Sequence, residues 1–338
     1  MATISDVAKK AGVSIATVSH VINNSRYVSE NVRNKVIEAM HLVQYQPNAL
    51  ARSLRRGKTH TIGLILPDSS NPFFAEMGRV IENEAFLYGY SVILGNSEGD
   101  GEKESHYIRV LTEKQVDGII LLAEGNRSEP LDLLLNQKMS FVLVDEEIHN
   151  SKANIDIVVI DNYGGGFAAT EHLIKLGHKR IACITGPYSI TLSAQRIIGY
   201  RDALEKYGLK YDQSMVLQGD FHQETGYIQA KALLSRPDKP TAIFACNDLM
   251  AMGAMRAAFE MGISVPKDLA IIGFDDIDFA SFTIPPLTTV AQPKSEMGKI
   301  AIKLLIDRMT NADHKFEHIC LSTKLIIRGS CGEAIKEK

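Results

Sequence analysis

The sequence predicts an α/β protein in which a small all-helical head precedes two doubly wound, parallel-sheet lobes. Three short amphipathic helix patterns follow one another within residues 1–46. From residue 61 onward, short apolar runs alternate with helical patterns, which is typical of parallel strands buried on both faces. The series restarts near residue 180, and this restart indicates two similar lobes.

The composition is that of an ordinary water-soluble chain. The 338 residues are 45% hydrophobic and 23% charged. No apolar run reaches the roughly 20 residues that cross a bilayer, and the start lacks the basic and apolar stretches of a secretion signal. We therefore expect a cytoplasmic protein with no membrane partner. Four widely spaced cysteines argue against disulfides and structural zinc, and we expect Cys183 and Cys246 to be buried thiols.

Charge is distributed unevenly along the chain. Residues 1–60 hold nine Lys and Arg against three Asp and Glu, a net charge of +6. The whole chain carries −3, so the remainder carries −3 − 6 = −9. A basic head on an acidic body indicates that the head meets a polyanion.

The head reads as a helix-turn-helix. We expect Thr3, Ser14 and Ser29 to cap its three helices, because each precedes an apolar-periodic run. Gly12 ends the first helix, so a tight turn joins it to the second, and the third helix braces both. The inward positions are Val7, Ala8 and Ala11 in the first helix, Val18, Val21 and Ile22 in the second, and Val32, Val36, Met40 and Val43 in the third.

The second helix has another face, formed by Ile15, Ala16, Thr17 and His20. In a helix-turn-helix this face enters the major groove, whose donor and acceptor pattern separates all four base pairs. His20 can hydrogen-bond a base, and Ile15 and Ala16 can contact thymine methyl groups. The alternative at this point is a solvated face of a small helical bundle.

A short basic segment follows the head. A helix starting at Pro47 and ending at Gly57 is too short to be stable alone. Leu50 and Leu54 share one face of it, and arginines surround them. An apolar wedge flanked by arginines suits a minor groove that is pried open and kinked. The alternative is a linker helix packed on its own body, and we favour the wedge.

These residues resemble the lactose/galactose repressor family of bacterial regulators. The resemblance is carried by residues 4–8, 11–14, 17–23 and 48–54 and extends over almost the whole chain. It implies that Ile15, Ala16 and His20 read bases and that Leu54 enters the minor groove at the operator centre. Asn48, Ala51 and Arg52 then belong with Leu54 to the hinge and minor-groove contact, and Leu50 packs the two hinges of a dimer.

The rest of the chain divides into two lobes with a cleft between them. Strand-like runs occupy 61–66, 90–94, 117–122, 141–145, 180–186, 242–246 and 269–274, with a helix near 73–89. The predicted domains are 1–46 for the head, 47–60 for the hinge and linker, 61–161 with about 292–322 for the first lobe, and 162–291 with about 323–338 for the second. Ligands of doubly wound sheets bind beyond the carboxyl ends of their strands.

Polar side chains follow those strand ends. They are Asn71, Asp145, Asn247, Asp248, Asp275, Asp276 and Gln292. Carboxylates and amides suit a polyhydroxylated ligand because they exchange hydrogen bonds with neighbouring hydroxyls. Phe73 and Phe74 could stack on a sugar ring, and Arg196 supplies a cation with several donors. The sequence therefore predicts a sugar site in the cleft.

The body is also similar to the periplasmic sugar-binding proteins. The ribose-binding pattern is matched by Asn71, Phe73, Phe74, Asp145, Arg196, Phe221, Asn247, Asp275 and Gln292. Glu146 stands where that pattern has a second arginine, so the resemblance implies a pentose or similar polyol and leaves the exact sugar open. Residues 176–187 and 280–289 look most like the ribose-responsive branch of the repressors, with the purine-responsive branch second.

An enzyme is the rival class of function. Residues 164–166 form a glycine run before a helix, but the phosphate-loop patterns GxxxxGK[ST] and GxGxxG are absent, and we expect close backbone packing there. GxSxG, HExxH and local metal-ligand clusters are also absent from the sequence. We expect no catalysis, metal or cofactor. Two regulatory alternatives stay open, a purine corepressor and a phosphorylated carrier protein, although the latter would not need Asp145 and Arg196 together.

The resemblance implies a homodimer on a near-palindromic operator, each head reading one half-site. No heptad pattern extends to Lys338, so we expect dimers that do not pair further. Ligand in the cleft would rotate one lobe against the other and shift the separation of the two hinges. A coupling of about 1–3 kcal/mol suffices for such a switch. Whether ligand releases or strengthens operator binding is left open.

Overall fold

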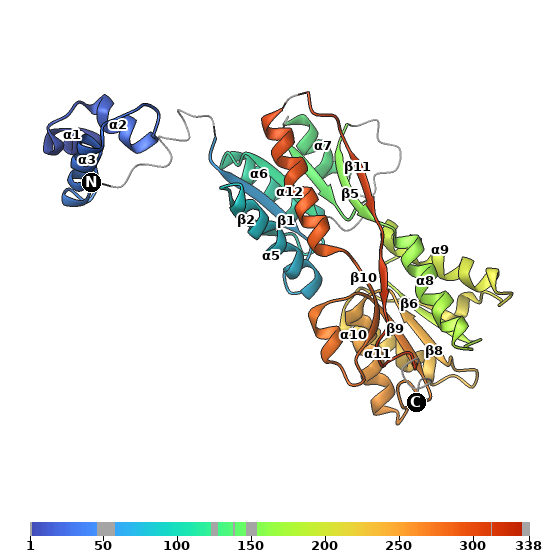
Figure 1. The fold of residues 1–338 in the computed structure, drawn as a ribbon. Coiled ribbons are helices and arrows are strands. Elements are labelled where there is room, and N and C mark those ends of the chain that lie inside the picture. The colour runs from blue at the N-terminus through green and yellow to red at the C-terminus, as the bar shows by residue number, and fades with distance from the viewer. Residues whose placement is uncertain are drawn as a thin grey trace. The chain divides into compact units, whose positions relative to one another are not determined.

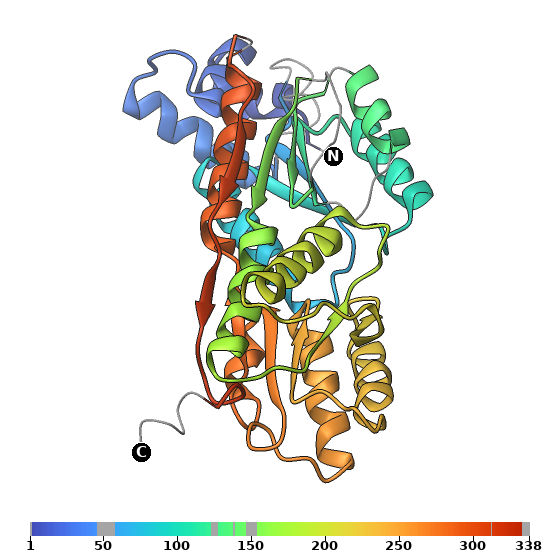
Figure 2. The ribbon, with the colours of Figure 1, turned by 90° about the vertical axis from the view of Figure 1, so that its right-hand side faces the viewer.

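The structure is a computed structural model that describes residues 2–45, 58–122, 128–137, 139–146, 154–311 and 313–332 (Figures 1 and 2). The chain forms two compact units, Met1–Thr59 and His60–Lys338. Each has its own hydrophobic core. Among the described residues, no helix is both long and apolar enough to span a membrane.

The head contains α1 (Ile4–Ala11), α2 (Ile15–Asn23) and α3 (Glu30–Leu42). Two of the three predicted caps are confirmed: Thr3 forms a reciprocal capping box with Asp6, and the Ser14 hydroxyl accepts from the Thr17 amide. Ser29 stands at the third N-cap but makes no side-chain capping hydrogen bond. The helices enclose a small core of buried residues, namely Val7, Ala8, Val18, Val21, Val36 and Ala39.

One inward prediction for the head is wrong in detail. Val32 is only half-buried, whereas the unpredicted Ala39 is buried. Val36 and Ala39 lie three residues apart, on the face of α3 that packs against α1. Val32 lies one turn before Val36 and does not pack against the core of the head, unlike the other predicted inward residues.

The body holds two six-stranded sheets, and we call the part around each one lobe 1 and lobe 2. In lobe 1 the strand order is β11 (His318–Leu321), β5 (Asp156–Ile160), β4 (Phe141–Val144), β3 (Gly118–Leu122), β1 (Thr61–Leu66) and β2 (Ser91–Asn96). In lobe 2 it is β12 (Lys324–Ile326), β10 (Thr288–Ala291), β9 (Ala270–Asp275), β8 (Ala242–Ala245), β6 (Ile181–Thr185) and β7 (Val216–Gln218).

Parallel pairing holds throughout except at one edge of lobe 2. There β12 pairs antiparallel with β10. The chain leaves β11 in the first sheet and after two residues enters β12 in the second, so no crossover helix turns it round. This segment is the red ribbon that runs along both lobes in Figure 2. An antiparallel edge on a parallel sheet is a common arrangement.

Helices cover the sheets, as the alternating sequence pattern predicts. Those of lobe 1 are α5 (Pro72–Leu87), α6 (Gly101–Glu113), α7 (Ser128–Asn136) and α12 (Lys294–Thr310). Those of lobe 2 are α8 (Asn162–Lys175), α9 (Thr191–Lys206), α10 (Gln223–Leu234) and α11 (Asp248–Glu260), with the 3-10 turns η1 (Gln213–Met215) and η2 (Asp278–Phe282). The chain thus crosses between the lobes after β5, after β10 and after β11.

The glycine run before the second lobe serves close packing, as predicted. A Cβ on Gly166 of α8 would lie 2.3 Å from the Arg196 carbonyl oxygen of α9, and one on Gly199 would lie 2.2 Å from the Tyr163 oxygen. Glycines therefore let the backbones of α8 and α9 touch. This contact places Arg196 at a fixed depth in lobe 2.

Replacing Gly166 by Ala should lower the free energy of unfolding by at least about 2 kcal/mol, because backbone atoms of α9 cannot give way to the new methyl group. The measurement is urea unfolding of the full chain. Gly78→Ala in α5 is the matched control, since its Cβ would meet only ordinary contacts at 3.8 Å. It should be neutral or stabilising by up to about 1 kcal/mol. Equal effects of the two variants would contradict the packing argument.

Candidate functional site

The predicted reading face of α2 is open on the head. Ile15 is 50% exposed and Ala16 is exposed. Thr17 is half-buried, with its hydroxyl 2.9 Å from that of Ser14. His20 is also half-buried, and its Nδ1 lies 3.0 Å from the Ser25 hydroxyl, which leaves Nε2 as the nitrogen that can meet a base edge. The helix is anchored by its cap and by Val18 and Val21, so this face is held rigidly.

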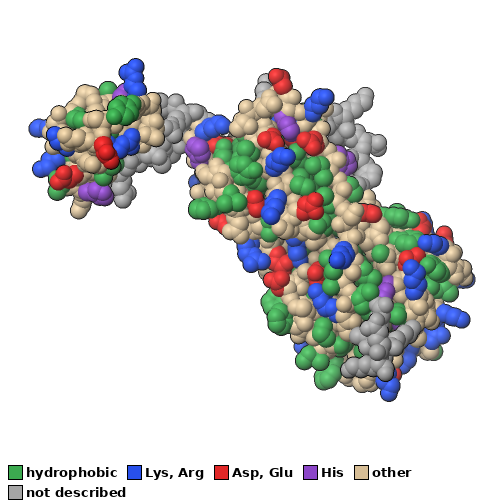
Figure 3. All heavy atoms as spheres, in the orientation of Figure 1, with side chains coloured by type: hydrophobic (Ala, Val, Ile, Leu, Met, Phe, Trp, Pro, Cys, Tyr) green, Lys and Arg blue, Asp and Glu red, His purple; other side chains and the backbone are tan. Residues whose placement is uncertain are grey.

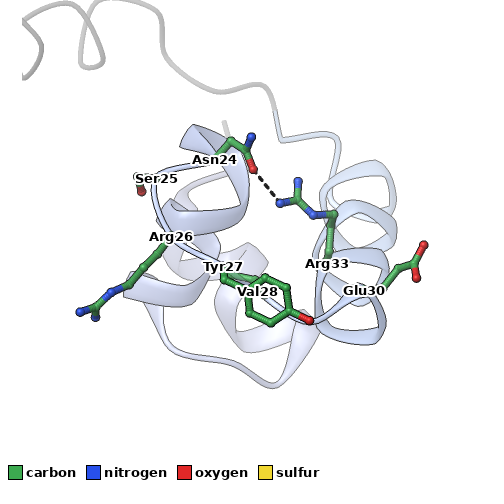
Figure 4. A pocket seen from close by; sticks show the side chains of 7 residues that line it. All are labelled: Asn24, Ser25, Arg26, Tyr27, Val28, Glu30 and Arg33. Atoms are coloured by element: carbon green, nitrogen blue, oxygen red, sulfur yellow. Dashed lines mark hydrogen bonds between the residues drawn. The ribbon is translucent and has the colours of Figure 1, made fainter.

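The sequence reasoning missed the loop between α2 and α3. Asn24 ends α2 in the left-handed conformation at φ 47° and accepts a 2.8 Å hydrogen bond from Arg33. Figure 4 shows Arg26 extending away from the loop, and Tyr27 is 92% exposed. These residues line an open groove of about 520 Å³. Arginine, asparagine and tyrosine are common donors to DNA phosphates. The sequence feature that could have predicted this groove is the polar run that directly follows α2.

The predicted hinge residues Asn48, Leu50, Ala51, Arg52 and Leu54 lie outside the described residues.

The structure brings all nine predicted effector residues around one pocket in the body. Lobe 1 contributes side chains from the start of α5 and from the end of β4. Lobe 2 contributes α9, the residues preceding α10 and α11, the end of β9 and the residue after β10. The lining is Asn71, Phe73, Phe74, Asp145, Arg196, Phe221, Asn247, Asp275 and Gln292, together with Ile190 and Leu192, which the sequence reasoning did not single out.

Three lining residues have strained backbones. Asp145, Phe221 and Asp275 have φ angles of 61°, 68° and 113°, in the region that side chains other than glycine rarely adopt. Such strain persists only where surrounding structure enforces it, and it concentrates at ligand sites. At this pocket it aims two carboxylates and one aromatic ring inward from both lobes.

Arg196 is the cation of the pocket and is only 3% exposed. Its Nε donates to the Asn162 side-chain oxygen at 2.8 Å, and its Nη1 donates to the Cys246 carbonyl at 2.5 Å. The guanidinium carbon lies 3.8 Å from the centre of the Phe274 ring. These contacts fix the fork geometry before any ligand arrives. Cys246 is a buried thiol, as predicted, with its sulfur 3.8 Å from that of Cys183.

The two pocket carboxylates have raised pKa values. Burial raises the pKa of Asp145 to about 7, although the charge of Arg196 opposes the shift. Burial likewise raises the pKa of Asp275 to about 6, against the effects of Arg196 and of Gln292, whose Nε2 donates to Asp275 at 2.8 Å. For both acids, the increase in pKa caused by desolvation is therefore larger than the decrease caused by the single guanidinium of Arg196.

Two polar atoms of the lining have no hydrogen-bond partner. They are Asp145 Oδ1 and Gln292 Oε1, both buried acceptors. A buried acceptor left without a donor costs about 1–3 kcal/mol. The pocket is therefore complementary to a molecule that brings hydrogen-bond donors.

Asp248 and Asp276, which were predicted at strand ends, do not line the pocket but bond to residues that position its lining. Asp248 accepts from the Ile277 amide at 2.9 Å and from the Thr289 hydroxyl at 2.5 Å. Burial raises its pKa well above the usual range. Asp276 instead pairs with Arg328 at 2.6 Å. Both hold the segment that carries Asp275.

The pocket is narrow. The volume open to the centre of a water molecule is about 20 Å³, room for one or two waters. A ligand of sugar size therefore requires the lining side chains or the two lobes to move apart. No cluster of three or more His, Cys, Asp or Glu that could hold a metal occurs in the described part of the chain.

Comparison with known proteins gives one family match for the head and one for the body. Residues 3–48 match the family described as bacterial regulatory proteins, lacI family, and residues 170–331 match the periplasmic binding protein-like domain. The ribose operon repressor of Escherichia coli K12 is 42% identical over 330 residues, covering 98% of this chain and all of that protein.

The chain belongs to the lacI family of bacterial transcriptional regulators.

Other members of the lacI family give the same result. The transcriptional repressor PurR of Haemophilus influenzae is 40% identical over 334 residues and 98% of both chains. A structure of the lac repressor dimer bound to operator and an anti-inducer aligns over 98% of this chain and 99% of that chain, with TM-score 0.88 and 28% identity. An Enterococcus faecium lacI-family regulator with bound ribose aligns over 80% of this chain and 98% of its own, with TM-score 0.72 and 32% identity. The fold predicted from the sequence is thereby confirmed, and the chain is a lacI-family regulator with a helix-turn-helix head and a periplasmic binding protein-like body.

Replacing Asp145 by Asn should make the protein more stable at high pH. The folded pKa near 7 lies above the ordinary value of 3.8, so the wild-type free energy of unfolding falls as pH rises from about 4 to 7 and then levels off. The variant lacks the part of that decline that Asp145 contributes, while Asp275 and Asp248 still titrate in both proteins. Its advantage should be near zero at pH 4 and about 2–4 kcal/mol at pH 8, measured by urea unfolding. A constant difference across the pH range would show that Asp145 titrates normally.

Proposed function

We propose that this protein represses transcription as a homodimer on a near-palindromic operator, and that a small pentose-like sugar in the pocket switches its affinity for that operator. The observation that carries the proposal is the pocket itself: residues from both lobes converge on it, and it presents buried acceptors that need donors. The chemistry is recognition, and no catalytic step is assigned to these residues.

A polyhydroxylated ligand matches the polar groups of the pocket. Sugar hydroxyls can donate to Asp145 Oδ1 and Gln292 Oε1 and accept from Arg196. Phe73 and Phe74 meet edge to face, with ring centres 5.1 Å apart, and offer an apolar surface to the C–H face of a sugar ring.

The two regulatory alternatives differ in what supports them. A purine would stack well between phenylalanine rings, and the 42% and 40% identities to a ribose repressor and a purine repressor do not separate the two ligands. Purine N–H groups could also donate to the two unpartnered acceptors, so the preference rests on the lining, which matches the ribose-binding pattern at nine positions, and we place the sugar first. A phosphorylated carrier protein as the input would not require a carboxylate and a guanidinium buried in one cleft.

Switching would follow from the position of the pocket between the lobes. A ligand that widens so narrow a space moves lobe 1 relative to lobe 2, which is a hinge motion of the kind that transmits binding. The chain crosses between the lobes three times, so the motion is constrained to a few directions. By thermodynamic reciprocity, a sugar that alters operator affinity has its own affinity altered by operator to the same extent.

For the operator, we propose that α2 enters the major groove with Ile15, Ala16, Thr17 and His20. Arg26 and Arg33 would contact phosphates beside it. Leu54 would enter the minor groove, Asn48, Ala51 and Arg52 would support it, and Leu50 would pack the two hinges together.

Exposed apolar side chains support the dimer. Figure 3 shows hydrophobic side chains in patches over both lobes, on the face that carries α5 and α12. In lobe 1, Phe86 and Leu87 are each 74% exposed, and Ile93 and Leu94 are exposed on the edge strand β2. In lobe 2, Phe282 and Ile284 are also exposed. Apolar patches and an open sheet edge are typical of surfaces that meet another chain.

The ligand proposal is tested by thermal unfolding of the full chain with D-ribose, other pentoses, hexoses, hypoxanthine and guanine. A ligand at about 100 times its Kd stabilises the folded state by roughly 2.7 kcal/mol, which is a shift of a few degrees. We expect D-ribose or a similar pentose to give this shift. A shift with hypoxanthine or guanine alone would overturn the sugar assignment and favour a corepressor.

The DNA proposal separates base contacts from phosphate contacts. An operator is first selected from a randomised duplex pool with the wild-type protein. His20→Ala and Leu54→Ala should each weaken binding to that operator by about 1–3 kcal/mol and hardly affect random DNA. Arg26→Ala should weaken both DNAs alike and reduce the salt slope by about one. If His20→Ala weakens binding to the operator and to random DNA equally, His20 does not contact bases.

A further inference from the structure

The segment that carries Asp275 is tied to the opposite lobe by one glutamate. Residues 275–278 follow β9 in lobe 2, and Glu76 lies on α5 in lobe 1, one turn after Phe73 of the pocket lining. The Asp278 amide donates to Glu76 Oε1 at 3.0 Å. Lys294 Nζ lies 2.7 Å from Glu76 Oε2. One carboxylate therefore uses both of its oxygens, one to hold an amide of lobe 2 and the other to hold the ammonium at the start of α12.

Lys294 completes the connection. Its Nζ also donates to the carbonyl oxygens of Asp275 at 3.2 Å and of Asp276 at 2.6 Å. Both of these aspartates have positive φ angles, 113° and 54°, so the ammonium stabilises the strained turn that aims Asp275 into the pocket. Lys294 is the first residue of α12, which follows β10 of lobe 2 and packs on α5 of lobe 1. It stands where the chain passes from one lobe to the other.

The two charged side chains of the network are largely shielded from solvent, although Asp278 itself is exposed. The side chains of Glu76 and Lys294 are each 14% exposed, so their attraction is screened less than that of a surface pair. The two ends of the network meet the pocket from opposite lobes, through α5 on one side and Asp275 on the other. Any movement that separates α5 from residues 275–278 must break the Asp278–Glu76 hydrogen bond and move Lys294 off one of its partners.

We propose that Glu76 and Lys294 form an inter-lobe latch that holds the pocket in its narrow arrangement and must open when an effector enters. The inference rests on the proposed effector site. The narrow pocket does not admit a sugar, so the free energy that keeps the latch closed opposes binding. Effector affinity is then set partly by a network that does not line the pocket, and Glu76 and Lys294 act as positioning residues.

The latch is tested without any effector, by residue-resolved amide hydrogen exchange on the full chain. Glu76→Gln should accelerate exchange of the Asp278 amide at least tenfold, because a carboxamide oxygen accepts more weakly than a carboxylate and no longer pairs with Lys294. Lys294→Met should accelerate it in the same direction, because Glu76 then loses the ammonium that holds its carboxylate in place. The neighbouring Ile277 amide donates to Asp248 within lobe 2 and should exchange at the wild-type rate. Glu82→Gln, the same charge change at an exposed position of α5, is the matched control and should alter neither amide.

Two exchange results would overturn the latch. Unchanged exchange at Asp278 in both variants would show that Glu76 does not hold the segment. Equal acceleration at Ile277 and Asp278 would show local unfolding of the segment, a structural role alone. If Glu76→Gln fails to fold, Lys294→Met carries the same comparison.

Calorimetry with D-ribose gives the functional readout. Glu76→Gln and Lys294→Met should bind D-ribose about 5- to 20-fold more tightly than wild type, and the double variant should gain less than the product of the two single gains. Weaker binding in both variants would overturn the inference, since the network would then belong to the ligand-bound arrangement. If D-ribose does not bind the wild type, the pentose assignment is wrong. The hydrogen-exchange rates of the Asp278 amide then still test the latch, because that experiment uses no ligand.

Discussion

The structure of the pocket depends on burying two carboxylates beside a single guanidinium. Asp145 comes from lobe 1 and Asp275 from lobe 2, and the charge of Arg196 acts on both. One cation does not offset the desolvation of two acids, so the pKa values of both rise toward neutrality. In such a site, the two buried acids have fewer favourable electrostatic partners than they would have in water. The site gains from a ligand that supplies donors to the acids, which is a physical reason for such a ligand to bind there.

The surrounding fold serves to keep this costly arrangement in place. Gly166 and Gly199 let α8 and α9 approach closely enough to set the position of Arg196, and Asn162 and Cys246 then orient its guanidinium. On the other side, Asp248 holds the Ile277 amide and so fixes the strained turn after β9. Backbone strain and a buried acceptor without a donor are separate costs of about 1–3 kcal/mol each. Because these costs occur together at one pocket, the surrounding structure must stabilise that pocket, which indicates that the pocket is functional.

Much of the fold and the site could be predicted from the sequence for an identifiable reason. Parallel strands are continuously apolar, so their ends are marked by the first polar residue, and Asp145, Asn247 and Asp275 each follow such a run. The caps Thr3 and Ser14 were predictable because capping is local. Gln292 likewise follows a strand, whereas Phe221 came from the family resemblance alone, since it has no local pattern that places it in a cleft.

What the sequence could not provide depends on contacts between distant parts of the chain. Asp248 and Asp276 carry the same strand-end signal as Asp275, yet they turn away from the pocket, because their backbone geometry sends them to Thr289 and Arg328. The partners Glu76 and Asp278 lie 202 positions apart in the chain. Glu76 also falls in an unremarkable helical stretch, and nothing local distinguishes it from the exposed Glu82 six residues later.

The same reasoning explains why the effector is harder to assign than the family. Family membership rests on many positions spread over the whole chain, so a few differences leave it intact. Ligand identity rests on about ten side chains and on how far two lobes can separate around them. Glu146 follows Asp145 at a position where the ribose-binding pattern has a second arginine, and a reversal of charge at such a position can alter ligand choice without altering the fold. Overall identities of 42% and 40% to two relatives therefore report the fold and the family, whereas the ligand is decided by the few side chains of the pocket and by the contacts that hold the lobes.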